Sequence, residues 1–253
     1  MELKGIGAIV AGGASGLGGA TAKMLADAGA KVAIFDLNED VGEAHAAEIG
    51  AIFQKVDVTR DESIAAAIEA AEAAQGVARV LVNCAGIAPA VRTVGRDNVP
   101  HSAEAFRRTI EVNLIGTFQM IARFAARLAA AEPIGEERGV IVNTASAAAY
   151  DGQIGQAAYA ASKGGIVGLT LPVARDLAQH KIRCMTIAPG LFLTPMMHTL
   201  PRATQDSLAA QVPYPSRLGR PEEYAQFVAS IIANPMLNGE VVRLDGALRM
   251  PPK

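Results

Sequence analysis

The stretch IGAIVAGGASGLG, residues 6–18, joins an unbroken apolar run to a glycine-rich turn. Apolar runs without alternation are typical of strands that helices cover on both faces of a parallel sheet. A helical pattern follows over residues 20–28 and stops at Gly29. This order of strand, turn and helix predicts a site where backbone N–H groups and a helix N-terminus bind a pyrophosphate, with Gly12, Gly16 and Gly18 permitting close approach.

An acidic residue stands where dinucleotide sites bind the adenosine ribose. The second predicted strand, residues 31–35, delivers Asp36 about 20 residues beyond the turn, where a carboxylate accepts hydrogen bonds from ribose hydroxyls. A carboxylate repels the 2′-phosphate of NADP, because like charges at short distance are unfavourable. The sequence therefore predicts NAD as the cofactor.

The remaining chain keeps alternating between strand and helix patterns. Strands are predicted at residues 51–58, 77–82, 140–145, 182–188 and 240–244, and helices at 39–48, 102–131, 156–177 and 221–233. A further helix, opened by a capping box at 59–62, is predicted to run to about residue 74. Right-handed crossovers then give a single domain over residues 1–253, a Rossmann-like, doubly wound parallel sheet of seven strands with helices on both faces. The glycine turn and the small residues Ala85 and Gly86 are predicted to meet where the strand order reverses.

A second motif, YAASK at residues 159–163, places a phenol and an ammonium one turn apart on the same helix face. A phenol titrates near pH ~10 in water, so Tyr159 needs the positive charge of Lys163 to act as a base at neutral pH. Ser146 follows a strand at the same sheet edge, where its hydroxyl can hold the oxygen that exchanges a proton with Tyr159. Asn113 is either a satisfied core amide or part of a water-holding network.

Two long connections border the predicted crevice. Residues 87–101 are polar and lack periodicity, and their basic side chains either meet an anionic group or are solvated: Arg92, Arg96 and His101. Residues 191–215 are predicted to form either a mobile substrate flap or a packed surface loop. The apolar side chains that such a flap would supply are Leu193, Met196, Met197 and Leu200.

Composition excludes several classes of function. The net charge of −2 and the mixed charge signs give no case for nucleic acid or an anionic membrane, and no apolar run reaches the roughly 18 residues of a membrane span. The strand pattern starts at residue 6, which leaves no room for a signal peptide and predicts a cytoplasmic location. Cys84 and Cys184 lack paired spacing, and the four histidines are scattered, so no metal site is predicted.

These motifs together resemble the short-chain dehydrogenase/reductase family over the whole chain. The resemblance rests on Gly12, Gly16, Gly18, Asp57, the stretch 83–86, Asn113, Ser146, Tyr159, Lys163, Pro189, Gly190 and Thr194. Residues 143–146, 155–159, 188–192, 213–219 and 238–246 are similar, more narrowly, to the subfamily of type-2 3-hydroxyacyl-CoA dehydrogenases. Two positions depart from the family pattern, because Ala11 replaces a usual Thr and Cys84 stands where a second Asn is common.

The resemblance implies a role for each site residue. Tyr159 is expected to be the general base, Lys163 to lower its pKa and bind the nicotinamide ribose, and Asn113 to hold a water. Ser146 and Gln156, with Tyr159, are expected to bind substrate. Further NAD contacts are implied for Ser15, Leu17, Asp57, Val58, Cys84, Pro189, Phe192 and Thr194. The family is usually homotetrameric.

The predicted reaction is the NAD-dependent interconversion of a secondary alcohol and a ketone, with 3-hydroxyacyl-CoA as the first choice of substrate. Two alternatives stay open. One is a dehydrogenase of hydroxysteroids or other apolar secondary alcohols with the same catalytic residues. The other is a catalytically idle NAD-binding scaffold, although such a protein has no physical need for Ser146, Tyr159 and Lys163 together.

Overall fold

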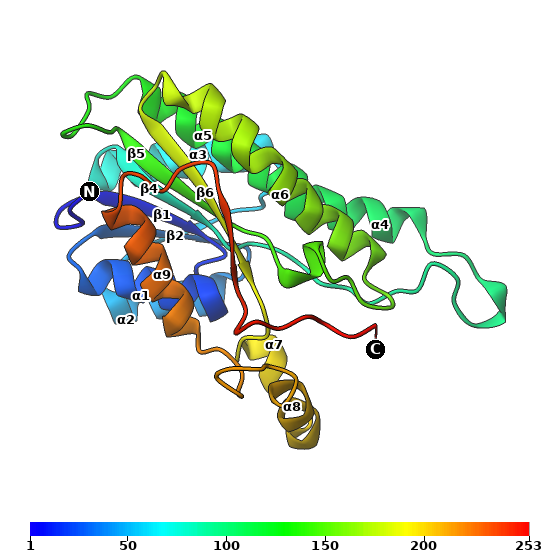
Figure 1. Cartoon of the computed structure of the whole chain (residues 1–253). Helices are drawn as coiled ribbons and strands as arrows, with labels where there is room; N and C mark the ends of the chain where they lie inside the picture. Colours follow the sequence, from blue (N-terminus) through cyan, green and yellow to red (C-terminus); the bar gives the residue numbers. More distant parts are fainter. Residues whose placement is uncertain (253) are drawn as a thin grey trace.

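A computed structural model describes residues 1–252, except for the side chain of Met196, whose predicted flap contact lies outside the described residues. The described chain forms one parallel sheet in the order β3-β2-β1-β4-β5-β6-β7 (Figure 1). The strands are β1 (Gly7–Ala11), β2 (Lys31–Asp36), β3 (Ile52–Lys55), β4 (Ala78–Asn83), β5 (Gly139–Thr144), β6 (Ile182–Pro189) and β7 (Val241–Leu244). The order reverses between β1 and β4, which confirms the predicted doubly wound, seven-stranded fold.

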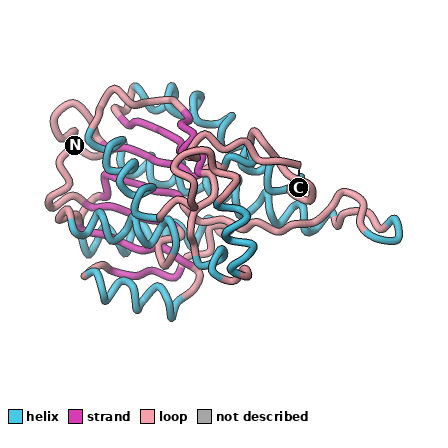
Figure 2. Tube along the Cα trace, turned by 60° about the horizontal axis from the view of Figure 1, so that its bottom comes forward, coloured by secondary structure: helices cyan, strands magenta, loops and turns pink. Residues whose placement is uncertain are grey.

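Helices cover both faces of this sheet, as Figure 2 shows for the strands in magenta. One face carries α1 (Gly16–Asp27), α2 (Glu39–Ile49) and α9 (Pro221–Ala233), and the other carries α3 (Asp61–Gln75), α5 (Gly116–Ala129) and α6 (Ala157–Ala178). Successive residues of a strand point to opposite faces, so Ala8 and Val10 join one apolar core and Ile9 and Ala11 the other. Within the described chain, no helix is long and apolar enough to cross a bilayer.

The predicted helix over residues 102–131 is divided. It consists of α4 (Ala103–Ile110), a π-helical turn η2 (Glu111–Ile115) and α5, with the Ser102 hydroxyl accepting the N–H of Ala105 at the start. Short 3-10 turns, η1 (Arg96–Asn98) and η3 (Ala147–Ala149), lie in the connections before α4 and α6. The connection 87–101 projects from the body of the molecule beside α4 (Figures 1 and 2).

The capping box predicted at residues 59–62 is wrong. Arg60 occupies the N-cap of α3 without a side-chain cap hydrogen bond. The Thr59 hydroxyl and N–H instead donate to Oδ1 of Asp57, at 2.7 and 3.0 Å. The side chain of Thr59 is thus held against Asp57, and the N-cap position falls one residue later, at Arg60. In addition, β3 ends at Lys55 rather than at residue 58, and α1 begins at Gly16 rather than at residue 20.

The predicted flap, residues 191–215, contains two short helices, α7 (Pro195–His198) and α8 (Arg202–Ala209). Its base is closed by backbone hydrogen bonds, because Leu193 N–H donates to Gly219 O and Gly219 N–H to Leu191 O, both at 2.8 Å. The segment is therefore a structured excursion with its ends held together. Its mobility stays a prediction.

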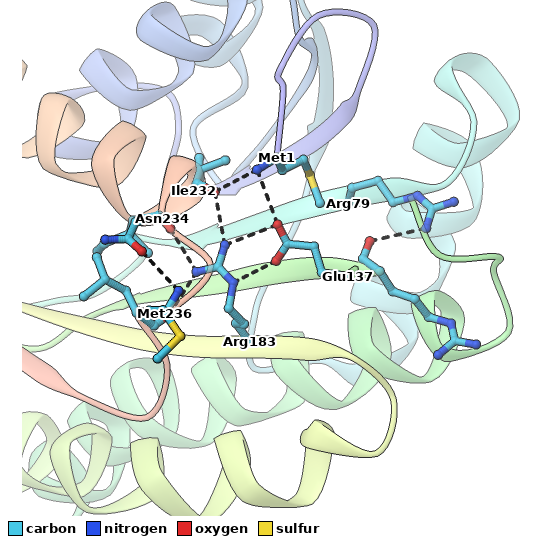
Figure 3. A network of polar contacts seen from close by, with 10 residues as sticks. Met1, Arg79, Glu137, Arg183, Ile232, Asn234 and Met236 are labelled. Atoms are coloured by element: carbon cyan, nitrogen blue, oxygen red, sulfur yellow. Dashed lines mark hydrogen bonds and ion pairs between the residues drawn. The ribbon is translucent and has the colours of Figure 1, made fainter. Parts of the chain in front are cut away.

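A buried ion pair secures α9 at the amino end of the sheet (Figure 3). Arg183, near the start of β6, donates to Glu137 at 2.7 Å and to the carbonyls of Ile231 and Ile232 in the last turn of α9. Arg183 is 6% and Glu137 8% exposed. A buried charge pair is tolerated when its remaining donors find acceptors, as they do here. This anchor lies at the opposite end of the sheet from the predicted site.

Candidate active site

The two glycine-bearing turns meet at the carboxyl edge of the sheet, as predicted. Gly12 has φ +75°, and a Cβ built there would lie 2.5 Å from the backbone N of Ala85. A Cβ on Gly18 would lie 2.0 Å from the carbonyl oxygen of Gly12. Only glycine fits at both positions, because real Cβ atoms do not approach backbone so closely. The turns therefore form one backbone-lined surface at the start of α1, suited to a pyrophosphate.

The carboxylate of Asp36 lies beside this surface. Its two oxygens accept the N–H groups of Ala14 and Asn38, at 3.1 and 3.0 Å. Each carboxylate oxygen has two acceptor sites, so capacity for ribose hydroxyls remains. Ser15 is exposed at the N-cap of α1 without a side-chain cap hydrogen bond, which leaves its hydroxyl at the mouth of the turn.

Lys163 is brought against the end of β5 by α6. It is 4% exposed, and its Nζ donates to the carbonyl oxygen of Thr144 at 2.7 Å and lies 5.9 Å from the ring centroid of Tyr159. A Cβ on Gly86 would lie 3.6 Å from the same Nζ, so the β4 turn borders the ammonium. Burial lowers the pKa of Lys163 to about 8, because a desolvated ammonium is unfavourable.

Tyr159 lies beside Ser146 in the structure. Burial raises the pKa of the Tyr159 phenol, and a hydrogen bond with Ser146 opposes that rise. Ser146 Oγ also accepts the N–H of Ala148 at 3.1 Å, which fixes the hydroxyl at the start of η3. Ser146 and Tyr159 can thus share one substrate oxygen. The effect of Lys163 on the phenol stays a prediction.

Asn113 lies in the π-helical turn η2 and is fully buried. Its Oδ1 accepts the N–H of Ile87 at 2.8 Å, and its Nδ2 donates to Ile87 O at 2.8 Å and to Ser162 Oγ at 2.9 Å. Of the two alternatives from the sequence, the described contacts give a satisfied core amide. It ties the start of the 87–101 connection to the catalytic helix, and its water-holding role stays a prediction.

The other predicted cofactor residues border the crevice in different ways. Thr194 lies over the glycine turn, since a Cβ on Gly16 would be 3.7 Å from its Cβ. The ring of Phe192 packs on Gly219 and is 7% exposed, so its backbone is what remains for a cofactor. Asp57 accepts both donors of Thr59, which holds its pKa below the ordinary value. Leu17 and Val58 are partly buried against the two cores, and Pro189 ends β6.

The two departures from the family pattern have different consequences. Cys84 Sγ accepts the Thr144 hydroxyl at 3.4 Å and lies 3.8 Å from the Tyr224 hydroxyl, so another hydrogen bond replaces that of the usual Asn. Ala11 pairs in register with Asn83, whose buried Oδ1 has no hydrogen-bond partner. Sequence reasoning missed the contact between Thr144 and Tyr224, because Thr144 was noted only as part of the segment 143–146 and Tyr224 lies in no motif.

Gln156 lines a surface cavity of about 380 Å³ at the start of α6, whose other lining residues include Arg92, Thr93, Gln153, Gly155 and Ala160. The backbone N–H of Val91 donates to Gly155 O at 2.8 Å and closes one side. The C-terminal tail supports the other, since Gln153 Nε2 donates to Pro251 O at 3.0 Å. Of the three basic residues predicted in this connection, Arg92 reaches the cavity. No sequence pattern indicated that the C-terminal tail would contact Gln153.

No metal site accompanies this arrangement within residues 1–252, where no three His, Cys, Asp or Glu side chains group to hold an ion. The geometry instead combines a glycine-rich turn, a carboxylate, and a hydroxyl, phenol and ammonium at one sheet edge. Against this background, the family model described as short chain dehydrogenase matches residues 7–205. The chain belongs to the short chain dehydrogenase family.

This short chain dehydrogenase has relatives that match nearly its whole length. It is 53% identical over 255 residues to 3-hydroxyacyl-CoA dehydrogenase type-2 of Rattus norvegicus, covering 99% of this chain and 98% of that protein. It is 34% identical over 244 residues to ipsdienol dehydrogenase of Ips pini, covering 95% and 96%. The crystal structure of 3-hydroxyacyl-CoA dehydrogenase type-2 from Mycobacterium avium matches with a TM-score of 0.95 and 47% identity over 98% of both chains. The resemblance found in the sequence is confirmed, and the protein is a dehydrogenase.

Proposed function

We propose that this dehydrogenase interconverts 3-hydroxyacyl-CoA and 3-oxoacyl-CoA with NAD. The observation that carries the proposal is the convergence of Ser146, Tyr159 and Lys163 beside the glycine turns, in a chain 53% identical over its length to a protein of that name. The bound nicotinamide supplies the hydride chemistry. The residues of this chain supply orientation and the path of the proton.

The roles of the catalytic residues follow from their positions. The Ser146 hydroxyl holds the substrate oxygen, and the neighbouring Tyr159 exchanges a proton with it as general acid or base. The Lys163 ammonium, fixed by the carbonyl of Thr144, lies where it can bind the nicotinamide ribose and favour the phenolate. A buried site strengthens such electrostatic effects, because little water screens them.

The choice of NAD rests on Asp36. Its carboxylate is held by two backbone N–H groups at the adenosine end of the crevice. The 2′-phosphate of NADP would meet the fixed negative charge of this carboxylate. We expect NADH to be preferred over NADPH in steady-state assays with the same ketone.

An acyl-CoA substrate suits the cavity beside Gln156. Arg92 lines this cavity and offers a bidentate donor to a phosphate, and Ala157 and Ala160 of α6, the helix that carries Tyr159, line it too. Arg96 lies on the same connection but is not among the lining residues. It therefore provides a matched control for any effect of Arg92.

The substrate test follows NADH consumption with acetoacetyl-CoA, with the acetoacetyl thioester of N-acetylcysteamine, and with free apolar ketones. We expect acetoacetyl-CoA to be the best substrate. Arg92→Gln should raise its KM by about fivefold, the size of a solvent-exposed phosphate contact, and leave the N-acetylcysteamine thioester unchanged. Arg96→Gln should change neither. A higher kcat/KM for free ketones than for either thioester would refute the acyl-CoA assignment.

A second candidate uses the same site for hydroxysteroids or other apolar secondary alcohols. The similarity to ipsdienol dehydrogenase supports it, because the identity of 34% spans almost the whole chain. A preference for free ketones would select this candidate. Tight NADH binding without turnover of any ketone would select the idle scaffold.

We also propose a homotetramer in the cytoplasm, on the basis of the family resemblance. Large apolar side chains are exposed on the neighbouring elements α4, η2, α5 and α6, namely Phe106, Ile115, Phe118 and Leu171. An apolar patch of this kind is typical of an interface between subunits. The cytoplasmic location remains a prediction from the sequence.

A further inference from the structure

Three polar side chains form a closed ring beneath the crevice. The hydroxyl of Tyr224, in α9, lies 2.7 Å from Thr144 Oγ1. Thr144 Oγ1 donates to Cys84 Sγ at 3.4 Å, and Cys84 Sγ lies 3.8 Å from the Tyr224 hydroxyl as a weak donor. If Tyr224 donates to Thr144, each group gives one proton and accepts one. We call this set the Cys84–Thr144–Tyr224 ring.

The ring joins three elements that border the cofactor crevice. Cys84 directly follows β4, Thr144 ends β5, and Tyr224 lies in the first turn of α9. Tyr224 is fully buried and Thr144 is 7% exposed. Burial holds the pKa of Tyr224 well above its ordinary value, so its hydroxyl stays protonated as a donor at neutral pH.

The ring leads to the catalytic ammonium through one residue. The carbonyl oxygen of Thr144 accepts the Nζ of Lys163 at 2.7 Å. Tyr224 therefore holds the side chain of the same residue whose backbone orients Lys163.

We propose that Tyr224 is a positioning residue, which holds Thr144 so that its carbonyl directs the Lys163 ammonium toward the nicotinamide ribose. This inference rests on the proposed use of NAD. It also gives a reason for Cys84 at a position where the family commonly has Asn, because the thiol completes the ring. The ring links the placement of Lys163 to α9, which directly follows the flap region.

The test uses Tyr224→Phe, which keeps the ring packing and removes the hydroxyl. Dissociation constants for NADH are measured by coenzyme fluorescence on the free enzyme, and KM for acetoacetyl-CoA by steady-state kinetics. We expect NADH to bind about fivefold more weakly, a fraction of one hydrogen bond, with KM for the thioester within about twofold. In a Lys163→Met background, Tyr224→Phe should cause no further loss, because its effect acts through the ammonium.

Two further variants complete the design. Thr144→Val removes the other hydroxyl of the bond between Thr144 and Tyr224, and it should weaken NADH binding as much as Tyr224→Phe does. Thr170→Val is the matched control, because Thr170 is a buried hydroxyl of α6 that pairs with Thr186 at 2.6 Å. It should lower the unfolding temperature without changing NADH affinity.

Each outcome has a definite meaning. The inference would be overturned if Tyr224→Phe and Thr144→Val both bound NADH with wild-type affinity. It would also be overturned if Tyr224→Phe weakened NADH binding equally in the wild-type and the Lys163→Met backgrounds. If Tyr224→Phe does not fold, Thr144→Val alone decides by the same criteria. A wild-type protein that fails to bind NADH would instead refute the proposed function.

Discussion

Lys163 illustrates at the scale of one residue how a catalytic site can cost stability. Its ammonium is buried, and its pKa falls from 10.5 to about 8. At pH 7 the folded and unfolded states are both protonated, so the folded state carries the full cost of the buried charge. Between about pH 8 and 10.5 the folded state has lost the proton that the unfolded state still holds, and the free energy of unfolding rises with pH.

Replacing this ammonium by an apolar side chain should therefore stabilise the protein at neutral pH. Lys163→Met removes the buried charge but leaves Thr144 O without its donor. We expect the free energy of unfolding to exceed that of wild type by about 1–2 kcal/mol at pH 7, and the difference to shrink at pH 10. Urea unfolding without coenzyme measures both values. A difference that does not change with pH would contradict the buried-charge explanation.

Asp36 carries the prediction of coenzyme choice. Asp36→Ala removes the carboxylate that would accept from ribose and repel a 2′-phosphate. We expect the ratio of kcat/KM for NADH to that for NADPH to fall by about 10- to 100-fold, a change of one or two charged contacts. The more distant Asp40→Ala, in the first turn of α2, serves as the control. A wild-type preference for NADPH would refute the assignment.

Single residues were predictable from the sequence where a local motif carries them. Tyr159 and Lys163 share a helix face by spacing alone, and Asp36 follows a strand at a set distance from the glycines. Thr144 and Tyr224 lie 80 positions apart in the chain and meet only through packing of α9 on the sheet. No spacing rule reveals such a contact, and none reveals the contacts of Asn113 with Ile87 and Ser162.

At the scale of elements, α9 depends on a cap that follows the flap region. Glu223 accepts the backbone N–H of Arg220 at 2.8 Å and pairs with Arg217, which together lower its pKa to about 2. A depressed carboxyl pKa contributes stability above pH 4.5, and this contribution is lost as pH falls from 4.5 toward 2. The start of α9, and with it Tyr224, is held by this carboxylate.

Glu223→Gln should loosen this helix start. We expect a loss of about 1–2 kcal/mol in the free energy of unfolding at pH 7, reduced from the full pKa effect because the side chain is partly exposed. The loss should shrink as the pH falls below 4.5 and disappear near pH 2. Glu222→Gln removes the same charge from the same helical turn and should cost less than half as much. Equal losses in urea unfolding of the two variants would show that helix dipole, not the cap, is responsible.

Helices and strands were predictable where the hydrophobic periodicity agrees with the residues that typically start or end such elements. Residues 221–233 were predicted with the bounds that α9 has, because Pro221 marks its first turn. The capping box failed because Thr59 is held against Asp57 and the N-cap falls on Arg60, and η2 was not foreseen because a π-helical turn leaves the helical pattern of residues 102–131 unchanged. Competition between neighbouring polar groups is decided by geometry, which the sequence pattern does not contain.

At the scale of the whole molecule, the exposed apolar side chains predict how subunits assemble. Phe118 is 51% exposed on α5, near Ile115 of η2. Phe118→Glu should place a charge in the proposed interface and lower the mass measured by light scattering after size exclusion. Val41→Glu, on α2 on the other face of the sheet, should leave the mass unchanged. A tetramer that survives Phe118→Glu would place the interface elsewhere.

The overall architecture followed from the sequence because each buried strand reads as an apolar run and each crossover must be right-handed. The irregular parts did not follow. The excursion of residues 191–215 and the contact of the C-terminal tail with Ile154 depend on backbone hydrogen bonds between separate segments of the chain, since Ile154 N–H donates to Pro252 O at 3.0 Å. Such bonds need no particular side chain on either partner.

The central claim is that the Tyr159 phenol transfers the proton of the substrate oxygen, and Tyr159→Phe tests it most directly. The variant keeps the ring and loses only the hydroxyl, so the NADH dissociation constant should stay within about threefold of wild type. Turnover of acetoacetyl-CoA with NADH should fall by at least about 100-fold, the usual contribution of a general acid or base. Turnover close to the wild-type rate in Tyr159→Phe would contradict the account.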